Sequence, residues 1–188
     1  MRLDHPNILP ECYVDTNLIE YLMHGTVSHQ QGCNQVVGTL KRRFSDRFAV
    51  GVIDKDKVKV GYLAECELVI ETDHLCVLKH KELPHFLITV KPAIDRFLLD
   101  CAKRQGVRPD SFGIPSQLKA FTKQSKKETS NHDSAFRNLI IALKDDSEIV
   151  FLGKTLRYLQ ECQYNSQPDF IKQLWLDLQD TDRDNGDQ

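Results

Sequence analysis

One short segment of the sequence, residues 48–53 (FAVGVI), constrains the fold more than any other feature. An uninterrupted apolar run of this length is typical of a β-strand that is covered on both faces, as in parallel sheets. The run stops abruptly at Asp54-Lys55-Asp56-Lys57. We therefore expect a buried central strand whose carboxyl end carries two carboxylates.

A second strand is predicted near the start of the chain. Residues 9–14 are short and largely apolar and end in Asp15-Thr16-Asn17, which indicates a strand running into the N-cap of a helix over residues 18–23. Residues 33–44 predict another helix. Because helix separates the two strands, we expect parallel neighbours joined by a right-handed crossover. Asp15, Asp54 and Asp56 should then meet at one edge of the sheet.

The remaining pattern predicts an α/β fold with a helical C-terminal region. Residues 74–78 read as a strand, residues 68–70 as part of another element, and residues 85–90 as either a strand or the start of a helix. Pro92 suits the first turn of a helix that ends near Gly106. The expected organisation is a Rossmann-like, mostly parallel sheet flanked by helices over residues 1–107, a helical appendage packed on it over 108–180, and a disordered acidic tail over 181–188.

Composition limits the partners and the cellular compartment that we expect for the chain. The formal net charge of −2 gives no global attraction to nucleic acid, so such a partner would need local patches. Two basic stretches qualify, and each also fits a solvated helix face: Lys41-Arg42-Arg43, and Lys119 with Lys123, Lys126 and Lys127. The six cysteines form no CxxC pair and read as buried thiols. Without a signal peptide or membrane-length apolar run, we expect a soluble cytoplasmic protein.

The Asp54-x-Asp56 pair is the strongest candidate for chemistry. Beyond a strand end, two carboxylates at this spacing can converge on one hard cation such as Mg2+ or Mn2+. An ordinary surface turn is the simpler explanation, but the buried strand before the pair favours a ligand site at the sheet edge. Asp15 is open to two interpretations, as a helix N-cap or as a further metal ligand.

These residues resemble a known family. Tyr13-Val14-Asp15, the helix after it, and residues 48–56 are similar to the Toprim domain of primases, topoisomerases and the overcoming-lysogenization-defect nucleases. Residues 74–79 and 82–88 are similar to the later part of Toprim nucleases of phage defence, so the resemblance covers roughly the first half of the chain. Toprim domains have a glutamate, usually followed by glycine, at the end of the first strand. Asp15-Thr16 is assigned to that position here, and Glu11 and Glu20 lie off it.

The resemblance implies metal-dependent phosphoryl transfer on nucleic acid, as a Toprim-type endonuclease with DNA preferred over RNA and a role in phage defence. Asp15, Asp54 and Asp56 would hold Mg2+ or Mn2+, and Lys79 would neutralise charge in the transition state. The lysines at positions 119, 123, 126 and 127 would track the phosphates. Lys79 also fits a surface position at a strand end. Since the sequence has no GxxxxGK loop, any ATPase partner would be a separate chain.

Two alternatives stay open. Residues 14–19 are also similar to the opening motif of PIN-domain ribonucleases, which would need further carboxylates among Glu65, Glu67, Asp95 and Asp100 and would leave Asp54-x-Asp56 without a role. The other alternative is a Toprim-like domain that has lost its glutamate and serves as an interaction subunit beside an ATPase.

Overall fold

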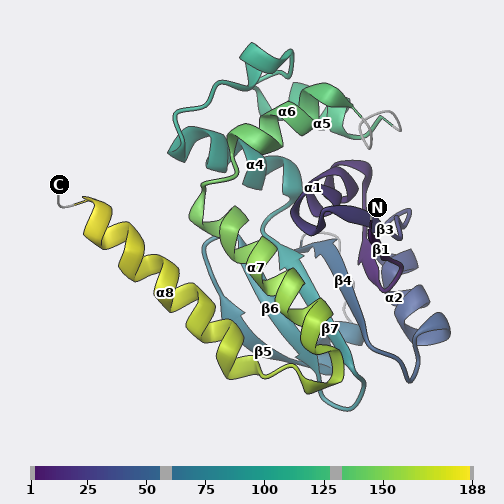
Figure 1. Ribbon diagram of the computed structural model, residues 1–188. Coiled ribbons are helices and arrows are strands. Elements are labelled where there is room, and N and C mark those ends of the chain that lie inside the picture. The colour runs from purple at the N-terminus through teal and green to yellow at the C-terminus, as the bar shows by residue number, and fades with distance from the viewer. Residues whose placement is uncertain (1–2, 56–60, 128–132, 187–188) are drawn as a thin grey trace.

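The computed structural model describes residues 3–55, 61–127 and 133–186. Its centre is a five-stranded sheet with the order β2-β4-β7-β6-β5 (Figure 1). The strands are β2 (Ile8–Pro10), β4 (Ala49–Asp54), β7 (His85–Val90), β6 (Leu75–His80) and β5 (Cys66–Glu71). The first three strands in this order are parallel, and β6 and β5 are antiparallel to their neighbours. A small parallel sheet of β1 (Leu3–His5) and β3 (Gly25–Val27) lies beside α1.

Strand β4 is buried along its whole length because helices cover both of its faces. Ala49 and Ile53 face α2 (Cys33–Arg43), in a cluster with Val36 and Leu40. Between them stands Gly51, where an added Cβ would lie 2.8 Å from Val36 Cγ1 and 2.9 Å from Leu87 Cδ1. A glycine therefore allows α2 to approach the sheet this closely.

The opposite face of the sheet packs against α1 (Tyr13–Met23), α7 (Ser147–Cys162) and α8 (Pro168–Gly186). In Figure 1, α7 lies across the sheet, and α8 begins beside β5 and extends past the edge of the sheet. One core cluster unites side chains of the sheet with side chains of these helices, for example Val50 and Ile88 with Phe151 and Ile171. Helices α7 and α8 therefore share a core with the sheet.

A third group of helices lies at the carboxyl ends of β4 and β7 (Figure 1). It consists of α4 (Ile94–Arg104), the short helix η2 (Pro109–Phe112), α5 (Leu118–Ser125) and α6 (Ser134–Ala142). Among these, α4 contacts α5, and α6 contacts α1 and η2. The edge of the sheet that the sequence marks with carboxylates is therefore enclosed by helices. A short α3 (Gly61–Ala64) precedes β5.

The structure confirms the α/β class, with parallel strands flanked by helices, and the parallel pairing of the first strand with the strand of residues 48–53. It also shows that residues 85–90 form a strand. Two expectations were wrong. The first strand stops at Pro10, and α8 continues to Gly186, through most of the segment expected to be disordered. No proline or glycine interrupts residues 169–185, so the turns packed on α7 propagate into the polar end.

Within the described residues, no helix combines the length and the apolar character that crossing a bilayer requires.

Candidate active site

Acidic side chains gather where β2 and β4 end. Pro10 pairs with Val52, so Glu11, which directly follows β2, lies beside the last residues of β4. The Glu11 Oε2 atom accepts a hydrogen bond of 2.9 Å from the backbone N–H of Asp54. Both carboxylates are buried, with exposures of 3% and 2%. The acidic residue at the end of the first strand is therefore Glu11.

Asp15 was expected at that strand end, and this assignment was wrong. The chain turns into α1 at Tyr13, and Asp15 lies in the first turn of the helix. Its Oδ2 accepts a hydrogen bond of 3.1 Å from the N–H of Cys12, and Cys12 Sγ accepts one of 3.4 Å from the N–H of Asp15. This reciprocal capping box starts the helix, and the positive end of the helix dipole favours the carboxylate. Of the two interpretations of Asp15, its helix-capping role is the one that the structure supports.

Asp15 is nevertheless close to the other acids. Burial raises the pKa of the Cys12 thiol well above its ordinary value, and the charges of Asp15 and Asp54 raise it further. The Cys12 thiol is therefore within electrostatic range of both carboxylates. Glu11 and Asp15 are near Asp54 in the structure, while Glu20 lies further along α1 and faces Arg137 of α6 at 3.9 Å. Asp56 lies outside the described residues.

Asp54 opens onto a cavity of about 220 Å³ between the sheet edge, α4 and α5. Its Oδ1 accepts a hydrogen bond of 2.9 Å from the N–H of Ile94 and so holds the start of α4. Asp95 lines the same cavity, and its side chain is only 8% exposed. Its Oδ1 atom is buried without a hydrogen-bond partner in the part of the chain that the structure describes. Arg96 and Lys126 supply positive charge to the lining.

A second cavity, of about 360 Å³, lies on the other side of Lys126 and is lined by Glu11, Cys12 and the loop that follows β3. His29 of this loop stacks on Tyr13, with ring centroids 4.5 Å apart, and its Nδ1 is 2.8 Å from Thr16 Oγ1. Burial lowers the pKa of His29, which keeps the imidazole neutral near pH 7. Lys126, which follows α5, lines both cavities and therefore brings positive charge to the acidic edge.

The donors at this edge are carboxylate oxygens, which suit Mg2+ or Mn2+ rather than a softer metal. The partnerless, buried Oδ1 of Asp95 is an atom that a cation would satisfy. Over residues 3–55, 61–127 and 133–186, no three Asp, Glu, His or Cys side chains are placed to hold one ion. Asp54 and Asp95 are the carboxylates that line this cavity, and Asp56, the second acid of the Asp54-x-Asp56 pattern, lies outside the described residues.

Lys79 and the basic stretch of residues 119–127 were both predicted to bring positive charge to the site, and the structure places most of these lysines elsewhere. Lys79 pairs with Phe86, which in turn pairs with Val50 at the start of β4, so it lies at the end of the sheet opposite Asp54. The antiparallel direction of β6 is the reason. Lys119 and Lys123 are exposed on α5, and Lys127 follows it; none of the three lines either cavity. Lys126 is the member of this basic stretch that reaches the site.

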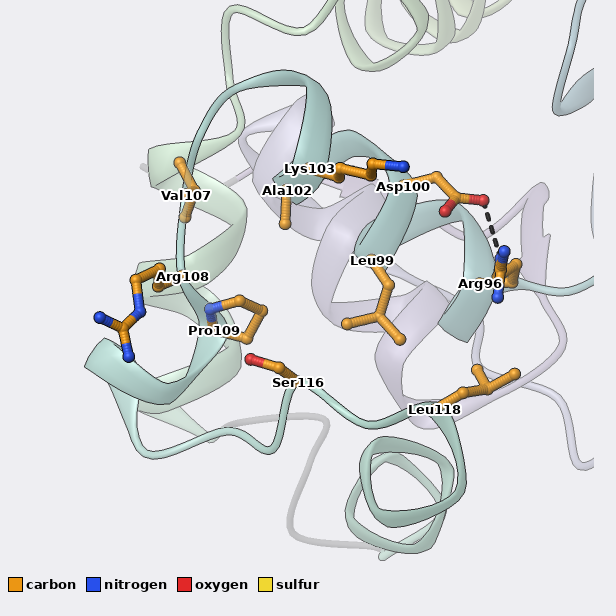
Figure 2. A pocket seen from close by; sticks show the side chains of 10 residues that line it. All are labelled: Arg96, Leu99, Asp100, Ala102, Lys103, Val107, Arg108, Pro109, Ser116 and Leu118. Carbon is orange, nitrogen blue, oxygen red and sulfur yellow. Dashed lines mark hydrogen bonds and ion pairs between the residues drawn. The ribbon is translucent and has the colours of Figure 1, made fainter.

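Arg96 belongs to α4 and lies at the border between the Asp54 cavity and a neighbouring one (Figure 2). Its Nε donates a hydrogen bond of 3.0 Å to Asp100 Oδ2. Asp100 in turn lies 3.2 Å from His74 Nε2. From the sequence, Asp95 was a candidate carboxylate only in the PIN alternative and Arg96 was not proposed, although Pro92 indicated that a helix begins near them.

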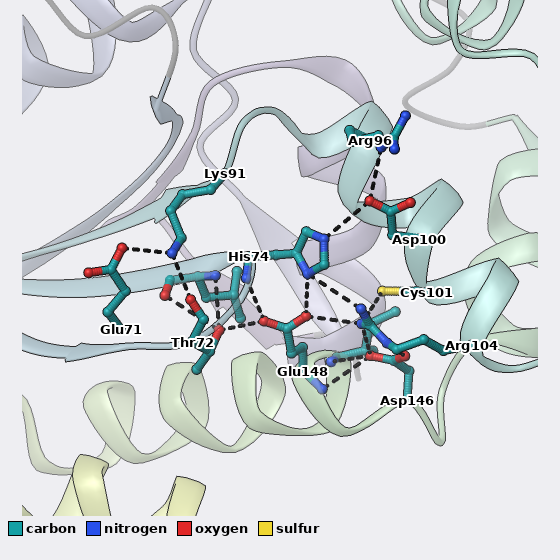
Figure 3. Close-up of polar contacts among 12 residues, drawn as sticks. Glu71, Thr72, His74, Lys91, Arg96, Asp100, Cys101, Arg104, Asp146 and Glu148 are labelled. Atoms are coloured by element: carbon teal, nitrogen blue, oxygen red, sulfur yellow. Dashed lines mark hydrogen bonds and ion pairs between the residues drawn. The ribbon is translucent and has the colours of Figure 1, made fainter.

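His74 connects this arginine to a buried network at the start of α7 (Figure 3). Its Nδ1 is 2.6 Å from Glu148 Oε2, and Glu148 Oε1 accepts the N–H of His74 at 2.8 Å. Arg104 donates to both oxygens of Asp146 at 2.8 and 2.9 Å and to Glu148 at 3.0 Å. The hydrogen bond to Asp146 raises the pKa of Arg104, so the guanidinium stays charged. The network ties α4, the turn before β6 and α7 together and fixes the position of Asp100.

Comparisons with protein-family models, with curated proteins and with solved structures found no match. The fold and the edge described above define an α/β protein with acidic residues at the ends of two adjacent parallel strands.

Proposed function

We propose that this chain is a metal-dependent phosphoryl-transfer domain of the Toprim type that cleaves nucleic acid, with DNA as the preferred substrate. The observation that carries the proposal is the position of Glu11. It follows the first parallel strand and hydrogen-bonds to the backbone of Asp54, the first acid of the Asp-x-Asp pair. The Toprim pattern has a glutamate at the end of the first strand and the Asp-x-Asp pair at the end of the second, so this position strengthens the resemblance.

In this proposal Asp54 and Asp56 hold Mg2+ or Mn2+, with Glu11 and Asp95 as the neighbouring carboxylates. When bound, the cation would polarise the scissile phosphate and stabilise the leaving oxygen. Glu11 lies at the same buried edge and would accept a proton from the attacking water. Lys126 and Arg96, which line the cavity of Asp54, would neutralise charge on the phosphate. Asp15 would act through Cys12 and the start of α1 rather than as the strand-end acid.

The alternatives have less support. The interaction-subunit hypothesis assumed a lost glutamate, and the position of Glu11 after β2 favours a domain that has kept it. The PIN hypothesis needs carboxylates near Asp15 and gives Asp54-x-Asp56 no role. Glu67 lies on the edge strand β5, and Glu65 pairs with His80 and Lys41. Asp100 contacts Arg96 and His74, whereas Asp95, the fourth candidate, shares the cavity of Asp54. A role in phage defence beside a separate ATPase chain remains part of the proposal through the family resemblance alone.

The test is plasmid nicking with Mg2+ or Mn2+, combined with calorimetric titration of each metal, on the wild type and on E11Q, D54N and E67Q. We expect metal-dependent nicking that falls at least ~100-fold in E11Q and D54N, since each removes a group of the charge-stabilising centre. E67Q is the matched control, because it makes the same change at an exposed carboxylate that only the PIN reading uses. Nicking that survives D54N, or that is lost in E67Q, would overturn the Toprim proposal.

A further inference from the structure

A cavity next to the proposed active site combines an apolar floor with a cationic rim. It lies between α4, η2 and the start of α5 and has a volume of about 380 Å³ (Figure 2). Leu99, Ala102, Val107 and Pro109 supply apolar side chains to its lining. Arg96, Lys103 and Arg108 supply positive charge, and Asp100 is the acid among the lining residues. The volume falls in the range of ~300–1,000 Å³ that is typical of small-molecule sites.

The single acid does not cancel the positive rim. Asp100 Oδ2 accepts the Nε–H of Arg96 at 3.0 Å and lies 3.2 Å from His74 Nε2 (Figure 3). Asp100 therefore offsets the charge of Arg96, and Lys103 and Arg108 remain as the cations of the rim. Lys103 and Arg108 are exposed, so their charged groups remain accessible to a ligand. An anion would meet a net positive rim here.

The cavity is continuous with the acidic edge through shared lining residues. Arg96 and Leu118 line both this cavity and the one that contains Asp54 and Asp95. Along α4, Asp95 and Arg96 are followed by Leu99 and Lys103 at helical spacing, which places them on one side of the helix. The two cavities are therefore neighbours along α4, so a strand that occupies one can extend into the other.

We propose that this second cavity seats one unpaired nucleotide of the strand whose neighbouring phosphate lies at Asp54. The base lies on the floor of Leu99, Val107 and Pro109, and Lys103 and Arg108 bind its phosphates. The inference rests on the proposed function and adds to it a substrate class, single-stranded or locally unpaired nucleic acid. A paired base cannot reach the floor without leaving its partner, which costs a few kcal/mol.

Binding is measured by fluorescence anisotropy with labelled dT12, an abasic 12-mer with the same phosphates, and a 12-bp duplex, all in EDTA so that no cleavage occurs. We expect the wild type to bind dT12 at least about fivefold more tightly than the abasic strand, because the base contributes its own contacts. K103A/R108A should weaken dT12 binding about tenfold and reduce the salt slope by about 1.4, since each phosphate contact to a single strand contributes ~0.7. K154A/K172A, with the same loss of charge on α7 and α8, is the matched control and should bind as the wild type does.

A free mononucleotide shares this chemistry, so dTMP is added as a competitor. Displacement of dT12 by equimolar dTMP would assign the cavity to a free nucleotide and overturn the strand assignment. Equal affinities for dT12 and the abasic strand, or unchanged binding in K103A/R108A, would refute the proposal that this cavity binds a nucleotide. These outcomes are separate from the proposed function, which is read from metal-dependent nicking. Base-dependent binding without nicking leaves the cavity in place and refutes the nuclease, whereas nicking with unaltered binding in K103A/R108A refutes the cavity alone.

Discussion

Replacement of Glu148 by alanine should be among the most destabilising single changes in the network of Figure 3. Glu148 is 3% exposed and accepts hydrogen bonds from Thr72 Oγ1, from the N–H of His74 and from Arg104. Removing one partner of a buried ion pair costs roughly 3–5 kcal/mol. Arg104 is 36% exposed and keeps Asp146, so water and Asp146 compensate part of the loss. We therefore expect a cost near the lower limit, about 3 kcal/mol.

The assay is urea unfolding followed by circular dichroism, with thermal unfolding as a second measurement. For a chain of this size the loss corresponds to a decrease in Tm of ~6–12 °C, at an unchanged dependence on urea. E148Q is the matched control: it keeps the shape and the acceptor for His74 and Thr72 but loses the charge opposite Arg104, and should cost about 1 kcal/mol. A cost below about 1 kcal/mol for E148A, or equal costs for the two variants, would refute the assignment of a buried charged network.

Two further predictions concern stability at other positions. Burial lowers the pKa of His85, whose Nε2 is 2.8 Å from the carbonyl oxygen of Phe44. The unfolded chain therefore binds the proton first, and the free energy of unfolding should fall as the pH drops below ~6.5. H85Q should reduce this pH dependence between pH 7.5 and 5 in urea titrations, and a pH profile identical to that of the wild type would contradict the assignment. G51A should lower the free energy of unfolding by about 1–3 kcal/mol because the new Cβ overlaps Val36 and Leu87, whereas G61A, with open space around its Cβ, should change it little; equal Tm values would show that α2 moves aside freely.

The sequence predicted the central strand well because its signal is local. Residues 48–53 are apolar without a break, and the first charged residue marks the strand end. Residues 9–14 gave a misleading signal, since the apolar residues after Pro10 belong to the first turn of α1. Cysteine is an uncommon N-cap residue, so the sequence did not predict a capping box from Cys12 and Asp15, although the two residues have the spacing of one. Because the sequence prediction ended this strand too late, it assigned the first acid of the site to Asp15 instead of Glu11.

Other parts of the site depend on contacts that no local pattern carries. His74 and Glu148 are 74 positions apart in the sequence, and Asp95 reaches the cavity of Asp54 only because α4 starts at the end of β7. The misplacement of Lys79 has the same origin, because the apolar pattern of residues 74–78 is the same for either strand direction. Sheet order and direction are set by the whole chain, and they determine which charges meet.

The core that the sheet shares with α7 and α8 has a consequence for how binding can be detected. The sheet lies between this core and the second cluster that it shares with α2, so we expect the chain to unfold as a unit. A ligand held at the carboxyl edge should then stabilise even helices that it does not touch. At a concentration of 100 times its dissociation constant, a ligand adds about 2.7 kcal/mol to the free energy of unfolding. The melting temperature of the intact chain is therefore a direct report on occupancy of the edge, for metals and nucleotides alike.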